Sequence, residues 1–176
     1  VIDPGHGGED GGAVSDTGVV ESGLNLEVSR RAKLLFCLFG DAPVMLRESD
    51  ISLHSGSAST LREKKASDLK NRVVKINSVK DALLISIHQN TYPEGRYSGA
   101  HIFYTSDESK PYAELLQKRI KEVLDPANNR EAKKVPSSIY LLNNVNCPAI
   151  LVECGFMTNR RELTLLQDPT YQIKLA

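Results

Sequence analysis

Apolar residues recur at helical spacing in four parts of the chain. An apolar residue every three or four positions predicts a helix from about Val20 to Gly40 and a second from about Leu61 to Val79. Two more helices are predicted, one starting at Ser109 and one from Arg160 to Leu166. The residues expected on the buried stripes are Leu24, Val28, Ala32, Leu35, Phe39, Leu69, Val73, Ile76, Leu115, Leu116, Ile120 and Val123.

Short apolar runs between these helices predict strands. The runs at 82–87 and 148–156 are nearly continuous in apolar residues, which is typical of strands covered on both faces. Strands are expected at residues 1–2, 42–49, 82–87, 99–106 and 148–156, and loops at 51–60, 91–99 and 125–138. Because strands and helices alternate, we predict a single α/β domain over residues 1–176, a three-layer α/β/α fold with a twisted, mainly parallel central sheet.

Composition narrows the classes of partner. The chain has 22 basic and 22 acidic residues, so its net charge argues against nucleic acid or an anionic membrane surface as a partner. No apolar run is long enough to predict a transmembrane segment. The three cysteines form neither a CxxC motif nor a disulfide framework, and each is expected to be a small buried hydrophobe. Because the sequence starts inside a strand, we expect a signal or anchor segment upstream.

Polar residues follow three of the predicted strands. The first strand leads to Asp3 and His6, the middle one to His88, and the last contains Glu153. Glu21 begins the first helix, from which it can return to the same place. Because ligands bind at the carboxyl ends of parallel strands, we expect two imidazoles and two carboxylates to converge in one crevice.

This set of side chains suits zinc hydrolysis. A catalytic zinc takes three protein ligands from His and carboxylate groups, and a second carboxylate then handles protons. Asn90 and the glycine-rich backbone are candidates to orient the ligands. Other interpretations remain open for single residues: a structural histidine, a Glu21 favoured by the helix dipole, or an anion-binding DPGHGG turn. A G-x-G-x-x-G dinucleotide motif fails, because Asp10 stands where its third glycine is needed.

Four blocks of the sequence resemble the zinc-dependent N-acetylmuramoyl-L-alanine amidases of the amidase-3 family. They occur in family order and span most of the chain, as VIDPGHGG, then Glu21 with Asn25-Leu26, then SIHQN at 86–90, then VECGF at 152–156. The stretch TLREKKASDLKNR and the pair IHQN resemble the sporulation-type members that trim spore-cortex peptidoglycan. Gln89 departs from the family pattern, in which many members carry alanine.

The resemblance implies a role for each residue of the crevice. His6, Glu21 and His88 would hold Zn²⁺, and Glu153 would act as general base and then acid. The enzyme would cleave the amide between the lactyl group of N-acetylmuramic acid and L-alanine of the stem peptide. In the spore cortex this is the first step toward muramic-δ-lactam. Peptidoglycan stem peptide and glycan strand would be the partners, and the location would be extracytoplasmic, in the cell wall or spore cortex.

Two other functions use the same residues. A different zinc peptidoglycan hydrolase, such as a carboxypeptidase, needs the same ligand set, and a non-catalytic wall-binding module needs no general base. Because the three ligands come from segments far apart in the sequence, we also hypothesise that an accessory protein or the substrate strengthens zinc binding.

Several further residues are assigned no catalytic role. A cysteine hydrolase built on Cys154 and His88 would leave His6 and Glu21 without a function. The remaining candidates are a solvated or substrate-facing His54, a structural His101, and an Arg47 that either binds an acidic stem peptide or forms a surface salt bridge.

Overall fold

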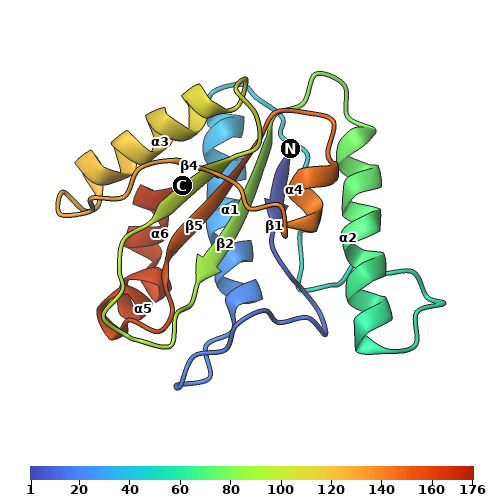
Figure 1. Ribbon diagram of the computed structural model, residues 1–176, viewed down its shortest axis with the longest axis horizontal. Coiled ribbons are helices and arrows are strands. Elements are labelled where there is room, and N and C mark those ends of the chain that lie inside the picture. The colour runs from blue at the N-terminus through green and yellow to red at the C-terminus, as the bar shows by residue number, and fades with distance from the viewer.

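A computed structural model describes residues 1–176 as a five-stranded sheet with helices on both faces (Figure 1). The strand order is β1-β2-β5-β3-β4. The elements in chain order are β1 (Ile2–Pro4), α1 (Glu21–Leu38), α2 (Leu61–Asn77), β2 (Leu84–Asn90), β3 (His101–Tyr104), α3 (Lys110–Val123), β4 (Lys133–Lys134), α4 (Tyr140–Asn144), β5 (Ala149–Phe156), α5 (Arg160–Gln167) and α6 (Pro169–Leu175). None of the helices is both long and apolar enough to cross a membrane.

The sheet is mainly parallel, as the alternation of elements predicts. Strand β2 lies between β1 and β5 and runs parallel to both, and β3 runs parallel to β4. Only the β3–β5 pair is antiparallel. The predicted α/β class is therefore confirmed, with one reversal toward the β4 edge.

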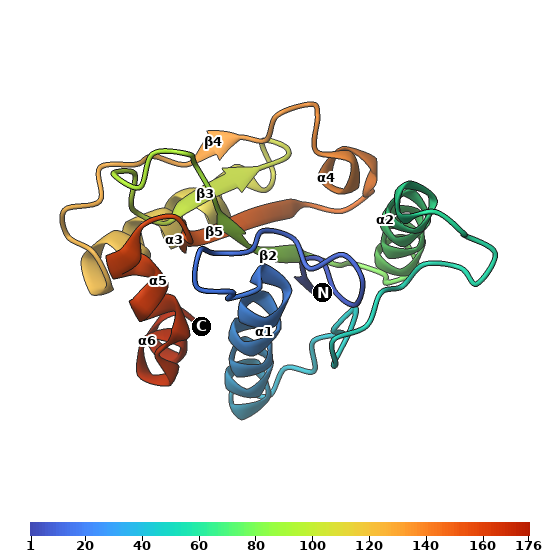
Figure 2. The same ribbon diagram turned by 90° about the horizontal axis from the view of Figure 1, so that it is seen from below.

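The two faces of the sheet bury different sets of helices. Helices α1, α3, α5 and α6 contribute to one apolar cluster, and α2 and α4 contribute to the other (Figure 2). Successive residues of a strand alternate between these faces. Along β5, Ile150 and Val152 join the α1 cluster and Leu151 joins the α2 cluster. By the same alternation Glu153 lies on the α2 face, and its parallel partner in the register is His88.

One predicted strand is wrong. Residues 42–49 form no strand; Met45 makes only an isolated bridge to Ile2. Pro43 cannot donate a hydrogen bond to a sheet, and Arg47 turns its side chain inward rather than alternating with its neighbours. This segment therefore runs beside β1 without extending the sheet.

Smaller differences concern short or exposed elements. β4 lies in the stretch 125–138 that was expected to be a loop, and the pattern did not predict α4 or α6. Three residues of the expected buried stripes are exposed instead, namely Phe39, Leu115 and Val123. Each lies at or near a helix end or on the outer side of α3, where no element packs over it. Amphipathic spacing alone does not reveal where the neighbouring elements stop.

Candidate functional site

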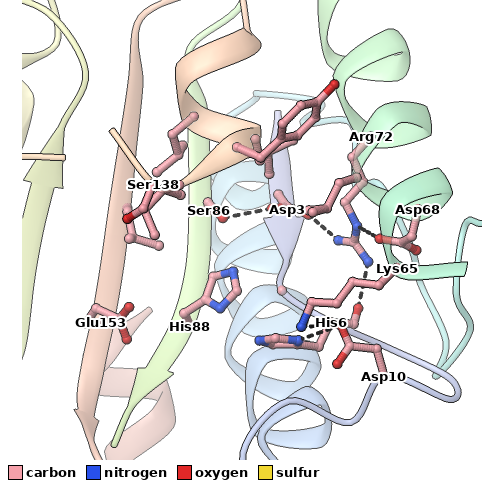
Figure 3. Close-up of a pocket in the computed structure, with 17 residues that line it drawn as sticks. Asp3, His6, Asp10, Lys65, Asp68, Arg72, Ser86, His88, Ser138 and Glu153 are labelled. Atoms are coloured by element: carbon pink, nitrogen blue, oxygen red, sulfur yellow. Dashed lines mark hydrogen bonds and ion pairs between the residues drawn. The ribbon is translucent and has the colours of Figure 1, made fainter. Parts of the chain in front are cut away.

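The site lies at the carboxyl ends of β1 and β2, next to β5. The loop after β1 carries His6, the first residue of α1 is Glu21, and His88 lies within β2 rather than after it. Figure 3 shows His6, His88 and Glu153 around one open space. The structure thus brings together the four residues that the sequence singles out.

Three of these side chains form a compact group of metal-ligating atoms. One donor atom from each of His6, Glu21 and His88 lies within 4.8 Å of the others. The Oε1 atom of Glu21 is 3.4 Å from Nε2 of His6 and 3.1 Å from Nδ1 of His88. Two imidazole nitrogens and a carboxylate oxygen are the ligand set of many catalytic zinc sites, so the residues present fit a zinc ion.

The backbone at His6 is held in an unusual conformation. His6 has a φ of 59°, in the left-handed region that residues with a side chain seldom adopt. Arg72 donates a hydrogen bond to the His6 carbonyl at 2.7 Å, and Gly7 donates to the carbonyl of Asp10 at 2.8 Å. These contacts offset the local strain and fix the direction of the imidazole.

Asp10 orients the His6 ring, a role that was not predicted from the sequence. Its Oδ2 lies 3.0 Å from Nδ1 of His6, which leaves Nε2 to face Glu21. A carboxylate behind a ligating histidine sets the tautomer and direction of the ring. The available signal was an acid four residues after His6 in the same glycine-rich turn.

Asn25 and Gln89 hold Glu21 from the α1 face. Asn25 lies one turn after Glu21, donating to Oε1 of Glu21 at 3.3 Å and to the Gly5 carbonyl at 3.1 Å. The backbone N–H of Gln89 donates to Oε1 of Glu21 at 3.2 Å, and the side-chain Nε2 of Gln89 donates to Oδ1 of Asn25 at 3.0 Å. Gln89 therefore supports Glu21, in part through Asn25. The side chain of Asn90, in contrast, makes no hydrogen bond to any of the three residues, so the expected orienting role is not found there.

Glu153 differs from the other carboxylates of the site in having no partner. Its Oε2 atom is buried and accepts no hydrogen bond. Burial raises the pKa of Glu153, the negative charge of Glu21 adds to that rise, and the nearby His88 opposes it. A carboxyl group with a raised pKa at the edge of a cavity is suited to accept and return a proton.

Hydrogen bonds outweigh burial in setting the pKa of both Glu21 and His6. Burial alone would raise the pKa of Glu21, but hydrogen bonds from His6 and His88 outweigh it and hold that pKa well below its usual range. Burial alone would lower the pKa of His6, but its hydrogen bonds to Asp10 and Glu21 raise that pKa to about 9. Glu21 is thus a fixed anion, as a ligand for a cation must be.

Two glycines make room for these side chains. A Cβ atom on Gly5 would lie 2.2 Å from Cε1 of His88, and a Cβ on Gly12 would lie 2.5 Å from Oε2 of Glu21. Gly12 also has a φ of +72°. Part of the glycine density of DPGHGGEDGG is therefore a steric requirement of the site.

Both interpretations of Arg47 are wrong. Its side chain is buried and makes neither a salt bridge nor a contact with solvent-facing acids. It donates to the carbonyls of Pro4 at 3.0 Å, Gly5 at 2.9 Å and Ser22 at 2.8 Å. Arg47 therefore ties the loop before His6 to the start of α1. Asp3 likewise faces away from the three metal-ligating atoms and pairs with Arg72 and Ser86.

The other candidates lie outside the three-residue group. His101 is buried, with Nε2 3.0 Å from the Glu131 carbonyl, and His54 has Nδ1 3.0 Å from the carbonyl of its neighbour Ser55. Cys154 is fully buried, and burial raises the pKa of its thiol. The expectation that all cysteines are buried holds fully only for Cys154, because Cys147 is half-buried and Cys37 is exposed near the end of α1.

The chain is similar in sequence to known cell-wall amidases. A family model described as N-acetylmuramoyl-L-alanine amidase matches residues 1–176. The germination-specific N-acetylmuramoyl-L-alanine amidase of Bacillus subtilis is 40% identical over 177 residues, which cover 99% of this chain and 73% of the relative.

Solved structures show the same fold. The CwlD amidase from Clostridioides difficile, determined in complex with the GerS lipoprotein, superimposes with a TM-score of 0.94 at 38% identity, over 99% of this chain and 90% of that one. An N-acetylmuramoyl-L-alanine amidase from Clostridium difficile 630 has a TM-score of 0.84 at 29% identity, over 99% of this chain and 88% of that one.

Proposed function

Because the chain belongs to the N-acetylmuramoyl-L-alanine amidases, we propose that His6, Glu21 and His88 hold Zn²⁺ and that Glu153 transfers the proton during amide cleavage. The observation that supports this most is the contrast within the site. Three donor atoms cluster within 4.8 Å, whereas the neighbouring Glu153 keeps a buried oxygen without a partner. The alternative function, a non-catalytic wall-binding module, would require no such carboxyl group.

The chemistry follows from these positions. Bound zinc would polarise the lactyl carbonyl and make a water molecule more acidic. Glu153 accepts a proton as the water oxygen attacks the carbonyl carbon, and it returns that proton to the amide nitrogen as the C–N bond breaks. The products are a lactyl carboxylic acid on the sugar and a stem peptide with a free L-alanine amino group. Asp10, Asn25 and Gln89 keep the His6 and Glu21 side chains in place throughout.

A digest of purified muropeptides tests the bond that is cut. We expect free stem peptides beginning with L-alanine, together with glycan lacking peptide, and no product from chelator-treated protein until zinc is restored. Release of only a carboxyl-terminal residue would instead support the zinc carboxypeptidase.

The biological setting is the spore cortex in this proposal. The support is the 40% identity to a germination-specific amidase and the TM-score of 0.94 to the CwlD amidase. Cleavage at the lactyl group exposes the carboxyl group that a muramic-δ-lactam requires. An extracytoplasmic location follows from that substrate. The solved complex of the CwlD relative with a lipoprotein supports an accessory protein for this chain as well.

The glycine beside His88 gives a direct test of the proposed ligand geometry. In Gly5→Ala the new methyl group overlaps the His88 imidazole, so the ring must turn away from Glu21. We expect zinc affinity to fall about 10- to 100-fold, which is the usual effect of mutating a group that orients a metal ligand. Competition with a chromophoric chelator measures it. Gly23→Ala is the control, because nothing lies within 4 Å of that Cβ position in α1. Equal zinc affinity for the Gly5→Ala variant and the parent would contradict the assignment of His88.

A further inference from the structure

A cavity opens beside the proposed zinc site and extends beyond it. It has a volume of about 240 Å³, and His6, His88 and Glu153 line one end. Helix α2 forms one wall, and Ile139 and Tyr140 at the start of α4 contribute to another. Ile139, which precedes α4, is 37% exposed, and Tyr140, the first residue of α4, is 42% exposed. The cavity is therefore open to a ligand larger than the scissile amide.

Most charges along this cavity neutralise one another. Arg72 is buried and paired with both Asp3 and Asp68. Lys65 is the exception: its side chain is 56% exposed and reaches from α2 toward Asp10, with its Nζ 3.4 Å from Oδ2 (Figure 3). That same oxygen is already 3.0 Å from the His6 ring.

The adjacent residue of α2, Lys64, is fully paired with a carboxylate and provides a comparison. Lys64 contacts both carboxylate oxygens of Glu9, at 2.6 and 2.8 Å. Lys65 has no carboxylate of its own, because Asp10 is shared with His6. It is the cation at the cavity rim with capacity to bind another anion.

The position of Lys65 sets which part of a substrate it can meet. The path from Nζ of Lys65 to the proposed zinc ligands is short. Nζ lies 3.4 Å from Oδ2 of Asp10, and that oxygen lies 3.0 Å from Nδ1 of His6. The other ring nitrogen of His6, Nε2, faces Glu21. An extended peptide covers that span with about two residues, at roughly 3.5 Å per residue. A carboxylate on the second residue beyond the scissile bond would therefore arrive near Lys65.

We propose that this cavity binds the stem peptide, and that Lys65 recognises the free α-carboxylate of the acidic residue following L-alanine. The inference rests on the proposed function and adds the side of the site on which the peptide lies. Charge favours the peptide, since stem peptides carry carboxylates whereas N-acetylated sugars carry none. Geometry agrees with this, because Glu153 lines the same cavity and must reach the departing amine of L-alanine.

Steady-state kinetics on two matched muropeptides test the proposal. One substrate carries the free α-carboxylate on the second stem residue, and in the other this group is an amide. For Lys65→Met we expect KM to rise about 5- to 10-fold on the carboxylate substrate, with kcat unchanged and little effect on the amide. Lys65→Arg should restore most of the affinity. Lys70→Met, which removes the same charge from an exposed position of α2 outside the cavity, should behave as the parent on both substrates.

The outcomes separate this subsite from the function on which it rests. If the parent releases no stem peptide from either substrate, both the proposed function and the subsite are overturned. If the parent cleaves both and Lys65→Met loses the same factor on each, the subsite alone is overturned. A loss confined to the carboxylate substrate supports it.

Discussion

Replacing Glu153 by glutamine should abolish most of the activity and leave the metal in place. The substitution keeps the shape of the side chain but removes its capacity to accept and return a proton. General acid–base catalysis is worth about 10²- to 10⁴-fold, so we expect kcat to fall about 1,000-fold, equivalent to about 4 kcal/mol of transition-state stabilisation. Zinc content should equal that of the parent, because Glu153 is not among the three clustered ligands. Elemental analysis and muropeptide kinetics on one preparation measure both quantities.

The control for this variant removes a carboxylate elsewhere. Glu114 lies on the outer side of α3 with a side chain that is 57% exposed, and Glu114→Gln should keep full activity. Activity of Glu153→Gln within a fewfold of the parent, at equal zinc content, would disprove the assigned proton transfer. Loss of zinc from that variant would instead mean that Glu153 belongs to the ligand set.

The sequence predicts the central strands well, because a short, mostly apolar run between predicted helices is typical of a buried strand. Residues 82–87 and 148–156 are mostly apolar on both faces, and they contribute to β2 and β5 inside the sheet. Peripheral elements were harder. β4 is two exposed lysines whose pairing to β3 is set by tertiary contact, and α4 is five residues long, too short for periodicity to register.

The residues that line the site could be predicted from the sequence, but the residues that support them could not. Polar side chains at strand ends and a helix start predict that His6, Glu21, His88 and Glu153 converge, and the structure places donor atoms of the first three together. Their division into ligands and a general base came from the family resemblance. The supporting roles of Asp10, Asn25 and Arg47 were not identified. Asp10 and Asn25 each lie four residues from the side chain that they hold, but polar residues at that spacing are too common to single out. Arg47 instead acts on backbone carbonyls that are distant in the sequence. Arg47 is the clearest case. A cation after an apolar run suggests a surface position, yet Arg47 is buried and donates to four backbone carbonyls, those of Pro4, Gly5, Ser22 and Ser49.

Removing a proposed ligand should separate metal loss from loss of the fold. In His88→Ala we expect zinc to be undetectable at equimolar metal and activity to fall at least 1,000-fold, since two remaining ligands cannot hold a catalytic zinc firmly. The metal-free variant should unfold within a few degrees of the metal-free parent, because His88 is only partly buried and lies outside both apolar clusters. Zinc should therefore raise the unfolding temperature of the parent but not of His88→Ala, as binding to the native state alone requires. His54→Ala, in the loop before α2, should bind zinc as the parent does. Full zinc occupancy in His88→Ala would show that the metal is held by a different set of residues.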